Sequence, residues 1–110
     1  MTLEEWHIMR AEEPAVLLYF YQERCGVCKA LFPKVQARQE KAFPGMRLVP
    51  VNARKSSVLA GQLRMLSVPG LLVFIDGREV SRANGHIALA RWEEEIQRLY
   101  EQFYDLGDGT

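Results

Sequence analysis

The two cysteines of this chain, Cys25 and Cys28, stand three positions apart between an apolar run and a helix-like run, and they are its only cysteines. The thiolate is the reactive form of cysteine. A helix N-terminus or neighbouring cations lower the thiol pKa from about 8.5 towards roughly 3.5 to 7.5. Arg24 and Lys29 supply cations, and a helix that begins at the motif adds its dipole. We interpret the pair as a dithiol suited to redox exchange.

Chain length and charge limit the other possibilities. With 110 residues, 48% of them hydrophobic, the chain can build one core but not two. We expect a single domain over residues 1–110, with a frayed polar tail at 105–110. It has fourteen basic and fourteen acidic side chains, and no run of like charge concentrates either sign. This pattern argues against nucleic acid or an anionic membrane as a partner and favours a protein or a small thiol.

The N-terminal residues lack the basic start and the apolar stretch of an export signal, and no apolar run reaches the roughly eighteen residues of a membrane span. We therefore expect a soluble cytoplasmic protein. Thiols are kept reduced in that compartment, so a close cysteine pair there is more often catalytic or metal-binding than structural.

The first half of the chain predicts a helix, a strand and a second helix. Thr2 and Glu5 form a capping box at the start of a short helix that ends before Pro14. The apolar run over 15–21 is typical of a strand buried on both faces. Apolar residues at helical spacing over 25–42 predict the second helix, which ends at Phe43-Pro44-Gly45.

The second half predicts three strands and two helices. Met46 to Val51 is expected to be a strand at the rim of the sheet, because Pro50 lacks a ladder donor. Ser56 or Ser57 is expected to cap a short helix that reaches Leu66. Asp76-Gly77 predicts a hairpin between strands at 71–75 and 78–82, and an amphipathic helix follows over 87–104. The order of elements predicts an α/β fold with a mixed sheet flanked by helices.

With Cys25 and Cys28 following the first central strand, the chain resembles the thioredoxin family from about Val16 to Leu99. Further features match that family in type and spacing: Pro33 inside the active-site helix, Val68-Pro69 where the family has a cis-proline, the Asp76-Gly77 turn, and Gly85 beside the groove.

The resemblance implies roles for these residues. Cys25, the more exposed cysteine, would attack a disulfide of the partner, and Cys28 would resolve the mixed disulfide. A docking groove for the partner would be formed by Arg24, Gly26, Val27, Val68, Pro69 and Gly85. The resemblance implies no cofactor beyond the redox-active disulfide Cys25–Cys28. Substrates would be disulfides of other proteins, and electrons would come from a reductase or from low-molecular-weight thiols.

The chain departs from the usual family motif at four positions. Arg24 replaces a tryptophan and Val27 replaces a proline. Because Arg24 should stabilise the Cys25 thiolate, we expect a reduction potential above the thioredoxin value of about −270 mV. Tyr19 stands where the family keeps a buried acid, and Pro50 where it keeps a lysine. No clear proton acceptor therefore remains near Cys28, and Glu23 is a weak substitute.

The family's N-terminal strand is missing from this sequence pattern, so the resemblance predicts a mixed four-stranded sheet. The strand at 46–51 then becomes an edge. An open edge can pair with a second copy of the chain, but Pro50 opposes such pairing. We expect a monomer and keep an edge-paired homodimer as the alternative.

Several other interpretations remain open. The cysteines could be inert buried thiols, or they could bind zinc or an iron–sulfur cluster, for which only His7 and His86 offer further ligands. His86 follows Gly85 and could assist proton transfer. The main function predicted is thiol–disulfide exchange. The alternative is an interaction module that binds a client in one redox state, with little catalytic turnover.

Overall fold

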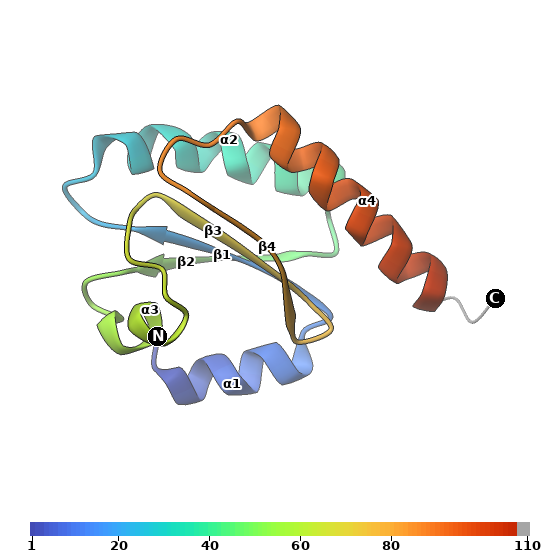
Figure 1. Ribbon diagram of the computed structural model, residues 1–110, viewed down its shortest axis with the longest axis horizontal. Coiled ribbons are helices and arrows are strands. Elements are labelled where there is room, and N and C mark those ends of the chain that lie inside the picture. Colours follow the sequence, from blue (N-terminus) through green and yellow to red (C-terminus); the bar gives the residue numbers. More distant parts are fainter. Residues whose placement is uncertain (108–110) are drawn as a thin grey trace.

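The computed structural model describes the backbone of residues 1–107 and the side chains of residues 1–103. Its elements follow the order α1 (Leu3–Glu12), β1 (Ala15–Tyr21), α2 (Gly26–Ala42), β2 (Arg47–Asn52), α3 (Ser57–Gln62), β3 (Gly70–Ile75), β4 (Arg78–Asn84) and α4 (Leu89–Gly107). The strands form one sheet in the order β2-β1-β3-β4. Helices α2 and α4 cover one face, and α1 and α3 cover the other (Figure 1). The expected mixed four-stranded sheet flanked by helices is confirmed.

Strand β1 lies in the middle of the sheet, parallel to β2 and antiparallel to β3. Its first six residues are buried, and successive side chains point to opposite faces. Leu17 and Tyr19 join the core beneath α2 and α4, while Leu18 and Phe20 join the core beneath α1 and α3. Both faces of β1 are covered, which explains why its sequence is continuously apolar.

The second core includes Trp6, which is fully buried on α1 and packs edge-on against Phe74 with ring centroids 4.7 Å apart. On the opposite face, Trp92 of α4 packs against Phe43. Both tryptophans therefore serve packing. Buried Gln39 donates from Nε2 to the carbonyl oxygens of Phe43 and Met46, at 3.0 and 2.8 Å, and so fixes the turn between α2 and β2.

Strand β2 is an edge of the sheet, as Pro50 predicts. Pro50 pairs in register with Tyr19 of β1 and is exposed. Within residues 1–107 no strand precedes α1, so β2 has only β1 as a neighbour. The strand covers 47–52 instead of the expected 46–51, and Met46 is buried before it begins.

Helix α3 differs most from expectation. It ends at Gln62, four residues before Leu66, because Arg64 adopts a left-handed conformation with φ of 54°. The N–H groups of Arg64 and Met65 donate back to the carbonyls of Gly61 and Ala60, a Schellman arrangement that ends a helix. The expected side-chain cap is also wrong. Ser56 occupies the cap position, but its hydroxyl instead accepts a 2.7 Å bond from the Met1 amino group.

The hairpin between β3 and β4 is confirmed. Asp76 and Gly77 both have positive φ, 53° and 75°, as a tight hairpin turn of this sequence requires. Strand β4 extends to Asn84, two residues beyond the predicted Arg82. Its register against β3 shifts between Val73 and Phe74.

Helix α4 begins at Leu89, two residues later than Ile87, and continues to Gly107. The expectation of a frayed tail from Asp105 is therefore wrong for residues 105–107, which are helical, while 108–110 lie outside the described residues. None of the helices in the described part of the chain is both long enough and apolar enough to cross a membrane.

Candidate active site

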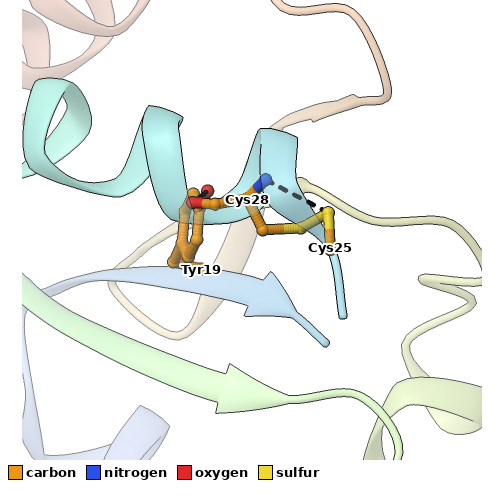
Figure 2. Close-up of a disulfide and its surroundings, with 3 residues drawn as sticks. All are labelled: Tyr19, Cys25 and Cys28. Atoms are coloured by element: carbon orange, nitrogen blue, oxygen red, sulfur yellow. Dashed lines mark hydrogen bonds between the residues drawn. A yellow bond between two sulfur atoms is a disulfide. The ribbon is translucent and has the colours of Figure 1, made fainter. Parts of the chain in front are cut away.

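Cys25 and Cys28 are joined by a disulfide at the junction between β1 and α2, with their Cα atoms 5.2 Å apart (Figure 2). Cys25 is partly exposed, whereas Cys28 is 1% exposed inside the first turn of α2. The two sulfurs therefore differ in access from solvent. A partner sulfur can approach Cys25, while Cys28 is almost completely buried.

Cys25 is the N-cap residue of α2, and its Sγ accepts a 3.1 Å hydrogen bond from the backbone N–H of Cys28 (Figure 2). The first N–H groups of a helix lack intrahelical partners, and the helix dipole places partial positive charge at this end. In the reduced protein the same position favours negative charge on the Cys25 sulfur, because a thiolate is stabilised at a helix N-terminus.

Tyr19 connects the central strand to the cysteine motif. Its side chain is 1% exposed, and its hydroxyl donates a 2.7 Å hydrogen bond to the carbonyl oxygen of Cys28 (Figure 2). Burial raises the pKa of the Tyr19 phenol above its ordinary value. The phenol is therefore protonated at neutral pH and acts as a donor. The burial of Tyr19 agrees with its place in the apolar run over 15–21, but its bond to Cys28 was not foreseen.

A cavity of about 330 Å³ opens beside Cys28 between α2 and the β1–β2 part of the sheet. Its walls are formed by Tyr19, Tyr21, Cys28, Lys29, Phe32, Pro33 and Pro50. No carboxylate or histidine is among these lining residues. This wall of the site therefore presents no carboxylate or imidazole base to the Cys28 sulfur.

The loop before β3 lies next to the residues that follow β4. The Val68–Pro69 peptide bond is cis. Pro69 is buried and Val68 is half-buried, and the N–H of Gly85 donates a 2.9 Å bond to the Pro69 carbonyl. Gly85 has φ of 71°, a conformation that side chains other than glycine rarely adopt. The structure thus brings together Pro69 and Gly85, two of the residues expected to form the groove.

Three further residues that were expected to form the groove lie beside the disulfide in sequence and are all exposed: Arg24, Gly26 and Val27. Val27 exposes 64% of its surface. Arg24 borders a polar hollow of about 240 Å³, which it shares with Gln22, Glu23, Asn52, Arg54 and Lys55. Glu23 forms an exposed ion pair of 3.3 Å with Lys55, so it faces that hollow and is not among the residues lining the cavity beside Cys28.

The two histidines are not part of the cysteine site. His7 is exposed on α1 and lines a hollow with residues of the β3–β4 turn. His86 is exposed and lines a different hollow with residues of β4 and α4. Within the described residues, no group of three or more histidine, cysteine, aspartate or glutamate side chains is placed to hold a metal ion.

Comparison with known proteins agrees with this geometry. The family model for thioredoxin matches residues 2–98. The chain is 30% identical to the thioredoxin-like protein YdfQ of Bacillus subtilis over 86 residues. This alignment covers 78% of this chain and 76% of that protein. It is also 37% identical over 70 residues to a thioredoxin of Chlamydia trachomatis, covering 64% of this chain and 68% of that one.

Solved structures show the same fold. The thioredoxin of Trypanosoma brucei brucei superposes with a TM-score of 0.80 at 16% identity, over 92% of this chain and 90% of that one. A Plasmodium falciparum thioredoxin gives 0.76 at 22% identity, over 86% and 93%. Fold and close cysteine pair together define the class of thiol–disulfide oxidoreductases. The family match over most of the chain makes the assignment narrower: this chain belongs to the thioredoxin family.

Proposed function

We propose that the protein exchanges its Cys25–Cys28 dithiol with disulfides of other proteins through a mixed disulfide. The observation that carries this proposal is the unequal exposure of two bonded sulfurs at a helix N-terminus. Cys25 is partly exposed and Cys28 is 1% exposed. This asymmetry suits one sulfur to intermolecular attack and the other to intramolecular release.

In the reducing direction, the Cys25 thiolate attacks one sulfur of the partner disulfide. A new S–S bond forms, the partner bond breaks, and its electron pair leaves on the second partner sulfur, which takes up a proton. Cys28, once deprotonated, attacks the Cys25 sulfur and displaces the first partner sulfur as a thiolate, which takes up the second proton. The partner gains two electrons and two protons in total, and the protein is left with the disulfide described here.

Val68, Pro69 and Gly85 are assigned to the docking of an extended partner segment beside Cys25, together with Arg24, Gly26 and Val27. The hydrogen bond from Gly85 to Pro69 supports a shared surface for two of these residues. The proposal needs no organic cofactor. A separate reductase or a low-molecular-weight thiol is proposed to return the disulfide to the dithiol, in the cytoplasm and with the protein as a monomer.

Insulin reduction tests this function. With dithiothreitol as the electron donor, the wild-type protein should accelerate precipitation of the insulin chains, and Cys25→Ser should abolish that acceleration. A wild-type rate equal to that of dithiothreitol alone would remove the proposal.

A second candidate is a redox-switched interaction module. The observation that favours it is the apolar cavity beside Cys28, because deprotonation of Cys28 without a nearby base limits the release step. Such a module would bind a client in one redox state and give no insulin turnover. Binding of a client to the oxidised but not the reduced protein, without turnover, would select this candidate.

A further inference from the structure

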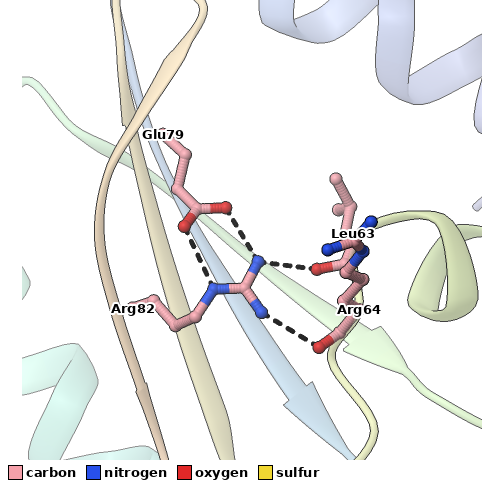
Figure 3. Close-up of polar contacts among 4 residues, drawn as sticks. All are labelled: Leu63, Arg64, Glu79 and Arg82. Atoms are coloured by element: carbon pink, nitrogen blue, oxygen red, sulfur yellow. Dashed lines mark hydrogen bonds and ion pairs between the residues drawn. The ribbon is translucent and has the colours of Figure 1, made fainter.

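A single side chain of β4 ties down the loop between α3 and β3, residues 63–69. The Arg82 guanidinium donates from Nη1 to the carbonyl oxygen of Arg64 at 2.9 Å and from Nη2 to that of Leu63 at 2.7 Å (Figure 3). These carbonyls lie just after α3, at its C-cap residue Leu63 and at Arg64, where backbone acceptors have no intrahelical partners. Arg82 therefore supplies the donors that complete the helix end.

Arg82 is itself fixed by Glu79. Its Nε donates to Glu79 Oε2 at 3.0 Å, and its Nη2 donates to Oε1 at 2.9 Å (Figure 3). All three guanidinium nitrogens are thus engaged. A two-pronged pair of this kind sets the plane of the guanidinium as well as its position, so the donors reach the loop in one orientation.

The pairing of Glu79 with Arg82 depends on the irregularity in β4. Residues three apart in a regular strand point to opposite faces. Here Glu79 pairs with Phe74 and Arg82 with Leu72, while Ser81 pairs with Val73, so the register gains one residue at Val80. Such a β-bulge turns both charged side chains to the face of Leu72 and Phe74, where α3 lies.

The tied segment leads directly to the cis peptide bond. Arg64 has φ of 54°, an uncommon conformation for a residue with a side chain, and its carbonyl is one of the two that Arg82 holds. Met65 is buried next, at a position where Gly70 leaves room for its side chain. Leu66 then exposes 84% of its surface before the chain reaches Val68 and Pro69.

We propose that Arg82, fixed by Glu79, is a positioning residue for partner docking: it sets where the segment from Leu63 to Pro69 lies. This segment enters β3 at Gly70, which pairs with Phe20 at the end of β1 that leads to the cysteine motif. Arg82 touches no reacting atom, so it acts through the backbone it holds. This inference rests on the proposed function, because the placement of Val68 and Pro69 affects catalysis only when a partner segment docks there.

The test compares two disulfide substrates of different size. Arg82→Met keeps the aliphatic stem and removes the donors. Arg38→Met is the matched control, since it breaks a partly exposed 3.1 Å ion pair with Glu93 away from this loop. In Arg82→Met, the KM for insulin should rise about tenfold with kcat nearly unchanged, the pattern of lost docking interactions. The rate with hydroxyethyl disulfide, which has no chain to dock, should stay at the wild-type value.

Arg82→Lys should recover little of the insulin KM, because an ammonium lacks the fork that reaches both the carboxylate and the carbonyls. If Arg82→Met does not fold, Glu79→Gln replaces it, and its insulin KM should rise about threefold as the guanidinium loses its charged partner. An unchanged insulin KM, or an equal loss with both substrates, would overturn the inference. A wild-type protein without insulin turnover would overturn the proposed function as well, which distinguishes the two failures.

Discussion

Tyr19 and Pro50 stand opposite each other on β1 and β2 and both line the cavity beside Cys28. In the thioredoxin pattern these two positions carry a buried acid and a lysine. Here they carry a phenol, whose hydroxyl is bonded to the Cys28 carbonyl, and an exposed proline. The pair thus converts a charged site into an apolar one, and the first two predictions follow from that change.

Tyr19→Phe should lower the free energy of unfolding by about 1 kcal/mol, because it leaves the Cys28 carbonyl without its side-chain donor. The rate of insulin reduction should stay within about twofold, since a phenol that is protonated at neutral pH is no base for Cys28. Urea unfolding and the insulin assay measure the two effects. A large fall in rate with unchanged stability would show that the hydroxyl takes part in the chemistry.

Tyr19→Asp should speed the release step. A carboxylate in the cavity would have a raised pKa through burial and would supply a base near the Cys28 sulfur, so the decay of a preformed mixed disulfide should accelerate about tenfold at neutral pH. Stability should fall by about 3 kcal/mol because an aromatic ring is lost from the core. Tyr19→Asn is the matched control. If both variants accelerate decay equally, access of water and not a base limits the step.

Cys28→Ser should accumulate a mixed disulfide with an oxidised protein substrate, because Cys25 can still attack but no second sulfur can release the product. Non-reducing electrophoresis and intact mass should show one covalent adduct per chain, which dithiothreitol removes. Cys25→Ser should show none. Equal trapping by the two variants would assign the attack to either sulfur and contradict the role given to the exposed one.

Arg24→Gln should lower the reduction potential by about 10 to 20 mV, since a cation beside the Cys25 thiolate stabilises the reduced form and solvent screens its exposed charge. The wild-type potential should lie above about −270 mV. Equilibration with glutathione measures both values. Arg78→Gln, at the far end of β4, should leave the potential unchanged. A rise in potential for Arg24→Gln would reverse the proposed effect.

The Glu79–Arg82 pair predicts a specific pH dependence. The hydrogen bond from Arg82 lowers the pKa of Glu79 below its ordinary 4.5, so the folded state binds fewer protons than the unfolded chain near that pH. The pair's contribution is present above pH 4.5 and is lost as the pH falls through the folded pKa. Because both side chains are partly exposed, the loss should be only a few tenths of a kcal/mol.

Glu79→Gln should flatten that part of the stability curve when urea unfolding is followed between neutral and acidic pH. An identical acid dependence in wild type and Glu79→Gln would show that the pair contributes nothing measurable to folding.

The features that sequence predicted well are those with local causes. The continuous apolar run before Cys25 indicated a central strand, Asp76-Gly77 a hairpin and Pro50 an edge, and each is found. These depend on intrinsic backbone preferences and on burial patterns within a few residues. The disulfide position followed from the spacing of its cysteines in the same way.

The features that sequence missed depend on contacts between distant residues. Helix α3 stops at Gln62 although an arginine, not a glycine, adopts the left-handed conformation after it. The left-handed conformation of Arg64 is supported by a hydrogen bond from Arg82, which lies eighteen residues away along the chain. The hydroxyl bond of Tyr19 likewise depends on how α2 packs over β1, which no local pattern encodes.

The bulge at Val80 carries a consequence for how this fold can vary. If β4 instead paired in strict alternation with Val80 retained, Val80 would stand opposite Phe74, and Glu79 would stand opposite Ile75, on the face beneath α2 and α4. Arg82 would keep its place but lose its carboxylate partner. A register shift of one residue, with no side chain altered, would thus uncouple the strand from the neighbouring loop.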